Sequence, residues 1–297
     1  MIKIGVNKLG LLLILVSCVL YVSAKKKITN IFYAQNTLDW FQNGPKSAEE
    51  KALLLKSIGY DGLEGFGYSD FFILSSALRD NGLKMPVNYV SLNVGLNGTV
   101  ENPSIEKIQE MISRSEKGSV MYFQLTSDVY KNDRSTGDKL IVTILQGLSD
   151  YAKGYGIRLC TYPHLSCYCE TVEYSVELAK MVNRKNYGAT LNLCHLLKVE
   201  GSKNIERKIV EYAPWLFAVN ICGADDGDTQ KMDWDRLIQP LGQGTFDTYL
   251  FVKLLIDNGY KGAFGLQCYN LKGDARQTLL NSLQTWKSFK IKYKNQK

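Results

Sequence analysis

Short apolar runs alternate with amphipathic stretches along most of the chain. Eight apolar runs predict strands near residues 28–33, 62–66, 85–94, 120–125, 157–162, 189–194, 216–222 and 263–268. Apolar residues at helical spacing, such as those between Val172 and Val182, follow nearly all of these strands. Gly or Asn stands between many helices and the next strand, where either residue can take the left-handed conformation that ends a helix. The pattern therefore predicts a repeating strand–helix unit.

Eight strand–helix units in about 270 residues are the expected size of a (β/α)8 barrel. The rival architecture is a doubly wound sheet, which usually carries a glycine-rich loop after its first strand. Here that position reads Ala-Gln-Asn-Thr at 34–37, and no linker divides the chain. We therefore expect an α/β fold with one TIM barrel over residues 25–297.

Residues 1–24 have the layout of a signal peptide. Lys3 and Lys8 precede an apolar run over 11–22, and the small residues Ser23 and Ala24 form a cleavage site. This pattern predicts export to the periplasm. The alternative is a lipoprotein anchored to a membrane through Cys18, because residues 15–18 also fit a lipidation motif.

The composition narrows the functional classes. With 297 residues, 45% of them apolar and 22% charged, the chain is neither disordered nor a disulfide-knit miniprotein. The formal net charge is +7, yet no long Lys/Arg block with interleaved aromatic residues appears, so no nucleic-acid partner is expected.

The cysteines are not spaced as a disulfide framework. Four lie in strand-like runs as buried thiols, and the Cys167–Cys169 pair lacks the second pair of a zinc site.

Polar residues gather at the ends of the last four predicted strands, where TIM barrels carry their chemistry. Three amides, Asn192, Asn220 and Gln267, stand among apolar residues at corresponding positions. Both histidines of the chain also fall here, His164 after Tyr162-Pro163 and His195 at the end of strand six. A neutral imidazole can accept a proton or donate a hydrogen bond near pH 7. These residues predict a polar pocket at the barrel mouth, with His195 and His164 as catalytic candidates.

Several segments together resemble the xylose-isomerase-like barrel superfamily of sugar and sugar-phosphate isomerases and epimerases. They are 162–164 (Tyr-Pro-His), 192–195 (Asn-Leu-Cys-His), 240–247 (Pro-Leu-Gly-Gln-Gly-Thr-Phe-Asp), 259–262 (Gly-Tyr-Lys-Gly) and 60–64, which is similar to the second strand of the family. The resemblance implies a small carbohydrate substrate. It matches His195 to a substrate-contacting histidine, and places Glu64 with Tyr162 and the three amides as substrate-binding residues.

The same resemblance implies that the metal site of the family has been lost. Metal-dependent members place Glu, Asp, His and Glu on strands five to eight, and the matching positions here are Tyr162, Asn192, Asn220 and Gln267. Neutral amides bind divalent cations poorly. We therefore expect no cofactor, and a divalent metal only if these positions are misaligned.

Three functions remain open. The first is an exported isomerase- or epimerase-like enzyme acting on a non-phosphorylated sugar or keto-sugar, with a lyase or hydratase acting on keto-glycosides as its variant. The second is a carbohydrate-binding barrel without activity. The third, DNA repair, is disfavoured because two histidines cannot build the zinc cluster that such chemistry needs.

Overall fold

The structure is a computed structural model that describes residues 27–296. The predicted signal peptide and its Cys18 lie outside the described residues, so export and lipid anchoring stay predictions. Within the described part, no helix has the length and apolar character needed to cross a bilayer.

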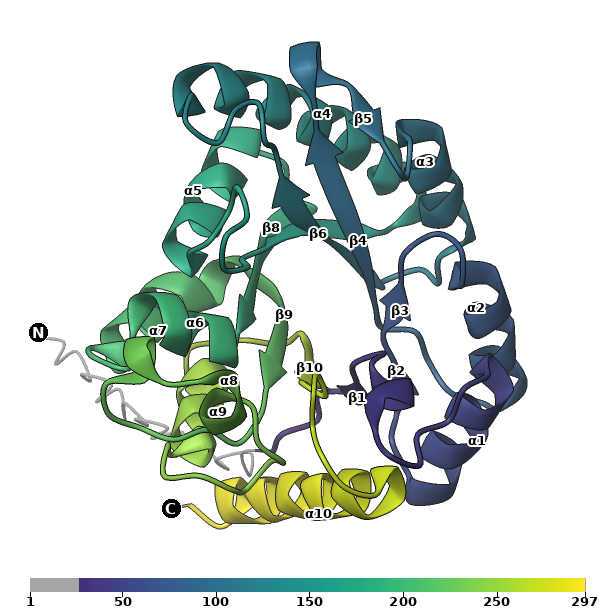
Figure 1. The fold of residues 1–297 in the computed structure, drawn as a ribbon, viewed down its shortest axis with the longest axis vertical. Helices are drawn as coiled ribbons and strands as arrows, with labels where there is room; N and C mark the ends of the chain where they lie inside the picture. Colours follow the sequence, from purple (N-terminus) through teal and green to yellow (C-terminus); the bar gives the residue numbers. More distant parts are fainter. Residues whose placement is uncertain (1–26, 297) are drawn as a thin grey trace, which may run out of the picture.

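Parallel strands form a ring in the middle of the molecule (Figure 1). They are β1 (Phe32–Ala34), β2 (Gly62–Leu63), β3 (Gly65–Phe66), β4 (Val87–Val94), β6 (Val120–Thr126), β7 (Arg158–Tyr162), β8 (Tyr187–Asn192), β9 (Leu216–Ile221) and β10 (Ala263–Leu266), with β5 (Val100–Glu101) paired antiparallel to β4. The order is β2-β1-β10-β9-β8-β7-β6-β4-β3, and only Glu64 separates β2 from β3 along the chain. The two ends of the sheet therefore meet in the segment 62–66, as the predicted eight-stranded barrel requires.

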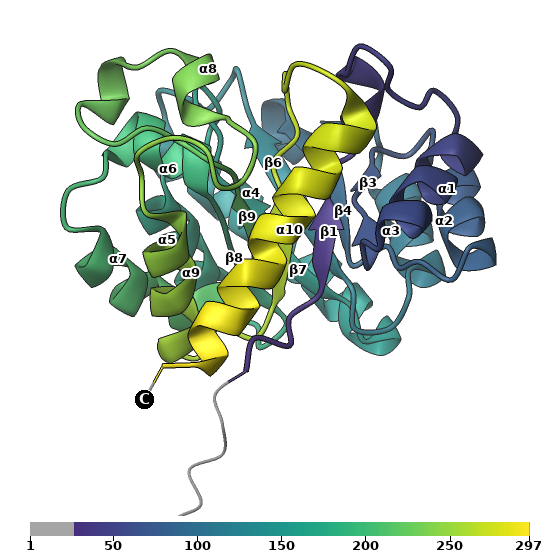
Figure 2. The ribbon, with the colours of Figure 1, turned by 90° about the horizontal axis from the view of Figure 1, so that it is seen from below.

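Helices surround this ring (Figures 1 and 2). They are α1 (Ala48–Ile58), α2 (Phe71–Asp80), α3 (Ile105–Arg114), α4 (Arg134–Tyr155), α5 (Val172–Val182), α6 (Leu193–Glu200), α7 (Ile205–Tyr212), α8 (Trp234–Leu237), α9 (Thr248–Asp257) and α10 (Ala275–Lys294). Helix α10 packs on β1 and β10, because the Trp286 ring lies 4.7 Å from Phe32 and 5.1 Å from Phe264 between ring centroids. The last helix thus joins the first and last strands.

Local signals in the sequence fix the ends of several helices. Ser47 and Glu50 form a reciprocal capping box at the start of α1, and Gly59 ends that helix at φ 99°. The six cysteines of the described residues are free and buried, which confirms the buried thiols predicted at Cys160, Cys194, Cys222 and Cys268.

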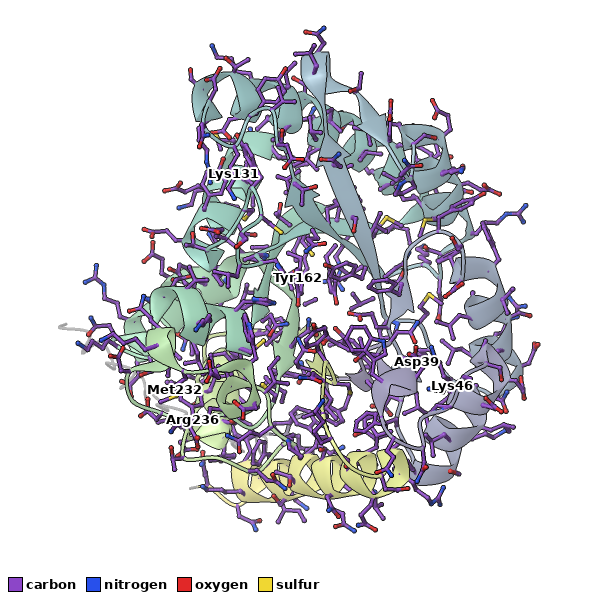
Figure 3. All side chains as sticks on the ribbon, viewed as in Figure 1. Asp39, Lys46, Lys131, Tyr162, Met232 and Arg236 are labelled. Carbon is purple, nitrogen blue, oxygen red and sulfur yellow. The ribbon has the colours of Figure 1, made fainter. Side chains whose placement is uncertain are left out.

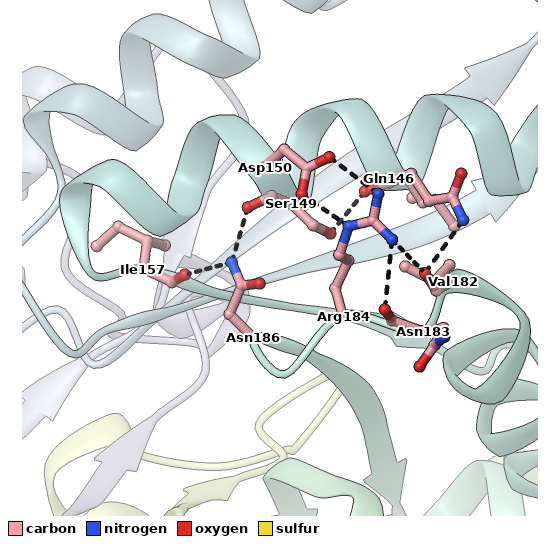
Figure 4. A network of polar contacts seen from close by, with 9 residues as sticks. Gln146, Ser149, Asp150, Ile157, Val182, Asn183, Arg184 and Asn186 are labelled. Atoms are coloured by element: carbon pink, nitrogen blue, oxygen red, sulfur yellow. Dashed lines mark hydrogen bonds and ion pairs between the residues drawn. The ribbon is translucent and has the colours of Figure 1, made fainter.

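Side-chain hydrogen bonds tie α4 to the turn that precedes β8 (Figure 4). Asn186 Nδ2 donates to the carbonyl oxygens of Ser149 and Ile157 at 2.8 and 3.3 Å. Arg184 donates to both carboxylate oxygens of Asp150 at 2.7 and 3.0 Å. These contacts lie at the end of the barrel where the strands begin, and so hold β8 in position without entering the mouth.

One predicted boundary is wrong. Strand β8 ends at Asn192, and α6 begins at Leu193, so His195 lies in the first turn of a helix rather than at the end of a strand. The reason is the Asn192 side chain, whose Oδ1 accepts from the Cys194 backbone N–H and caps the helix.

Candidate functional site

A cavity of about 380 Å³ opens at the end of the barrel where the strands finish. Five of the seven predicted site residues line it: Glu64, Tyr162, His164, His195 and Gln267. Figure 3 shows Tyr162, the last residue of β7, near the centre of the ring. A larger hollow of about 530 Å³ lies at the opposite end, near Lys84 and Arg158. In TIM barrels that end serves stability, so the mouth is the candidate active site.

The other two predicted residues, Asn192 and Asn220, do not line the cavity. Asn192 Nδ2 donates to the Tyr162 hydroxyl, and its Oδ1 caps α6. Asn220 is fully buried, and its Oδ1 accepts a hydrogen bond of 2.8 Å from the Tyr33 hydroxyl. Both amides form hydrogen bonds with the hydroxyl groups of buried tyrosines, and the bond from Asn192 holds Tyr162 in position.

The two histidines meet at the cavity wall. Their ring centroids lie 4.2 Å apart, and the His195 ring packs edge-on against Trp234. Burial, reinforced by the nearby His164, lowers the pKa of His195 to about 3. His195 is therefore neutral at physiological pH. Its Nδ1 is buried and has no hydrogen-bond partner among the described residues.

His164 is less enclosed, and its tautomer follows from its contacts. Its Nδ1 lies 2.9 Å from the carbonyl oxygen of Leu165, and a carbonyl can only accept, so Nδ1 donates the hydrogen bond. Burial lowers the pKa of His164 below its usual value. Neutral His164 consequently keeps Nε2 as a free proton acceptor.

Glu64 supplies the carboxyl group that lines the cavity. It is 3% exposed, and its oxygens accept hydrogen bonds from the Asn36 backbone N–H at 3.3 Å and from Gln35 Nε2 at 3.5 Å. Burial raises the pKa of Glu64 to about 8, because these two hydrogen bonds offset only part of the cost of a buried charge. The carboxyl is therefore mostly protonated at neutral pH.

Aromatic side chains form much of the remaining wall. Trp40 and Tyr269 approach to 4.8 Å between ring centroids, and each is about half exposed. Phe66 stacks on Tyr89 at 5.2 Å. No lysine or arginine lines the cavity. The sequence pattern does not mark these aromatic residues as site residues, although Trp40 and Tyr269 each follow a strand end within six residues.

The donor set at the four metal positions of the family does not fit a divalent cation. Tyr162, Asn192, Asn220 and Gln267 carry no charge at neutral pH, and the first three bond to one another or to buried tyrosines. Gln267 Oε1 accepts from the Tyr269 backbone N–H. Within residues 27–296 no three His, Cys, Asp or Glu side chains are grouped as a metal site.

Residues 53–288 match the family model of the xylose isomerase-like TIM barrel, and the chain belongs to that family. The resemblance seen in the sequence is thus confirmed. No curated protein sequence matches the chain.

Solved structures show the same fold at low sequence identity. The IolI protein with a bound zinc atom is 18% identical with a TM-score of 0.67, covering 89% of this chain and 99% of its own. The 3-keto-D-glucoside 4-epimerase YcjR from E. coli is 16% identical (TM-score 0.64, 86% and 98% covered). D-psicose 3-epimerase from Clostridium cellulolyticum H10 is 12% identical (TM-score 0.66, 87% and 99% covered).

Proposed function

We propose that the protein binds a small, non-phosphorylated carbohydrate in the mouth cavity and catalyses proton transfer on it, as a sugar isomerase or epimerase does. One observation carries the proposal: a single cavity holds aromatic walls, two neutral histidines in contact and no cationic side chain. Aromatic faces suit the C–H surfaces of a sugar ring, whereas a phosphate group binds best to lysine or arginine, and neither lines this cavity.

His164 is the proton acceptor of this proposal. Its Nε2 is free because Nδ1 donates to Leu165, and its lowered pKa keeps the ring neutral near pH 7. A general base of this kind contributes on the order of 10²- to 10⁴-fold to a proton-transfer rate.

His195 is assigned a different role, as a hydrogen-bonding contact to a substrate oxygen. A histidine with a pKa of about 3 is a weak base, and an unpartnered buried nitrogen is costly unless a ligand satisfies it. Bound substrate would supply that partner.

The reaction is proposed to proceed without a metal ion, since the four family positions supply only neutral groups. Two proteins of similar structure are a 3-keto-D-glucoside 4-epimerase and a D-psicose 3-epimerase, which supports a carbohydrate substrate. A neighbour described as a probable 3-DHS dehydratase from Bacillus anthracis keeps the lyase or hydratase variant open.

Solvent exchange tests the proposal. The purified protein is incubated in D₂O with methyl 3-keto-α-D-glucoside or D-psicose, and loss of the C–H signal beside the carbonyl is followed by proton NMR. We expect exchange with one of these sugars, and a loss of 100-fold or more in His164→Asn. Unsaturated product would assign the lyase variant. Ligand-induced thermal stabilisation without exchange would contradict catalysis and leave a carbohydrate-binding barrel.

A further inference from the structure

Glu64 is a buried carboxyl group without a cationic partner. Its side chain lines the mouth cavity and is held by Gln35 and Asn36. Lys51, which contacts the neighbouring Asn36, donates to Asn36 Oδ1 and pairs with Asp39. No lysine, arginine or histidine is among the groups that set the pKa of Glu64.

The groups that face Glu64 are uncharged. They come from separate strands: Tyr33 on β1, Tyr89 on β4 and Tyr162 on β7, with Cys268 just after β10. Burial raises the pKa of each of these groups, so none supplies charge near neutral pH. An ionised Glu64 would therefore be buried and unpaired, and the cost of such a charge favours the protonated acid.

The backbone places Glu64 between two short strands, β2 and β3. Residue 64 interrupts the strand between β2 and β3, and the neighbouring Gly65 allows close approach, because a Cβ there would lie 2.3 Å from Asn88 Oδ1. Thr37, also on the cavity wall, has a buried hydroxyl with no partner among the described residues. An unsatisfied hydroxyl in the same cavity as a buried carboxyl marks a place for a polar ligand atom.

We propose that Glu64 is the proton donor of the site and that the substrate is a keto-sugar whose carbonyl oxygen lies against Glu64. This inference rests on the proposed function, and it narrows the substrate from carbohydrates in general to those that carry a free ketone. A neutral carboxylic acid can donate a hydrogen bond or a proton to that oxygen, which polarises the carbonyl where a metal ion would otherwise be needed.

The proton-transfer step balances between two side chains. His164 Nε2 takes the proton from the carbon beside the carbonyl, and the C–H electron pair forms the carbon–carbon double bond of an enediol. The carbonyl π electrons move to oxygen, which takes the proton of Glu64. Glu64 then carries a negative charge and His164 a positive charge. In epimerisation the enediol hydroxyl gives its proton back to Glu64 as the carbonyl re-forms, and His164 returns its proton to the same carbon once the enediol presents its other face. In isomerisation His164 gives its proton to the former carbonyl carbon, and the hydroxyl on the neighbouring carbon gives its proton to Glu64 as that carbon becomes the carbonyl. Both side chains are restored in either case.

The protonation state of Glu64 is measurable without activity. Infrared difference spectra between the native protein and Glu64→Gln isolate the carboxyl stretch of residue 64. We expect a protonated-acid band at pH 7 that disappears as the pH rises through about 8. Glu177→Gln, which changes an exposed glutamate on α5, is the matched control and should leave the band intact. Absence of the band at pH 7 overturns the donor role.

Activity and binding measurements separate the two proposals. We expect Glu64→Gln to slow exchange of methyl 3-keto-α-D-glucoside by 100-fold or more, and to weaken the preference of the protein for that sugar over methyl α-D-glucoside. Exchange that Glu64→Gln leaves unchanged overturns the donor role alone. If the native protein exchanges no sugar although the carboxyl titrates as expected, the proposed function fails and the donor role fails with it.

Discussion

His164 and His195 pack ring against ring, with centroids 4.2 Å apart, in the wall of the mouth cavity. Two imidazolium ions cannot share this space at low cost, because the charge on one lowers the pKa of the other. His195 is the more deeply buried ring, so a proton that enters the pair resides on His164. The two histidines are therefore not equivalent bases: His164 can accept a proton, whereas His195 stays neutral.

The low pKa of His195 predicts a loss of stability in acid. In the unfolded chain this histidine gains a proton below pH about 6.5, whereas in the folded protein it stays neutral to about pH 3. Its contribution to stability is therefore full above pH 6.5 and declines as the pH falls, by up to about 1.4 kcal/mol per pH unit.

Denaturant unfolding of the native protein and of His195→Asn, at pH 7 and at pH 4.5, measures this contribution. The native protein should lose more unfolding free energy between the two pH values than the variant does. Equal losses would show that His195 titrates normally in the folded state.

Glu64 predicts a pH dependence of the opposite sense. Its pKa is about 8 in the folded protein, and the unfolded carboxyl ionises near pH 4.5. Its stabilising contribution is present below pH 4.5 and is lost as the pH rises towards 8, again by up to about 1.4 kcal/mol per pH unit. Glu64→Gln should therefore be more stable than the native protein at pH 8, and close to it at pH 4.5. Thermal melts at both pH values check this, with Glu177→Gln as control; a variant that is less stable at pH 8 would contradict it.

The exposed aromatic side chains at the mouth predict a loss of sugar affinity when they are removed. Tyr269→Ala should weaken binding of a keto-sugar roughly tenfold, which corresponds to about 1.4 kcal/mol of stacking and burial. Tyr155→Ala is a suitable control, because Tyr155 is equally exposed, 42% against 43%, but lies at the end of α4 away from the cavity. Calorimetric titration separates the two variants, and equal affinities would exclude Tyr269 from the binding surface.

Asn186 should contribute more to stability than the ion pair beside it. Asn186→Ala removes two part-buried hydrogen bonds to carbonyl oxygens, at a cost of about 0.5–1.5 kcal/mol each. Asp150→Asn breaks a solvent-exposed pair with Arg184 and should change the unfolding free energy less. Denaturant titrations of the two variants give the order directly, and a larger loss in Asp150→Asn would reverse it.

The barrel could be predicted because its signals are local. Strand periodicity, the Ser47 capping box and the glycines after helices are each encoded within a few residues. The end of β8 was misplaced for the same reason: Leu193 and Cys194 fit a strand or a helix equally well, and the capping bond of Asn192 decides between them.

The sequence predicts the site only in part, because the direction of a side chain depends on how the strands pack around the barrel. Asn192 and Asn220 occupy the expected strand ends, yet they bond to Tyr162 and Tyr33 instead of lining the cavity. The acidity of Glu64 depends on burial from several strands, which no single segment encodes. Trp40 follows the first strand and Tyr269 the last strand along the chain, so their contact at the mouth depends on the tertiary fold and not on a local pattern.

The dependence of proton exchange on a metal ion is the first property to measure. The protein is treated with a chelator and dialysed, its metal content is determined by elemental analysis, and exchange of deuterium into methyl 3-keto-α-D-glucoside is measured before and after treatment. We expect an unchanged exchange rate, because His164 and Glu64 carry the proton transfer. Loss of exchange on chelation, with recovery when a divalent ion is added, would contradict it and return the protein to metal-dependent chemistry.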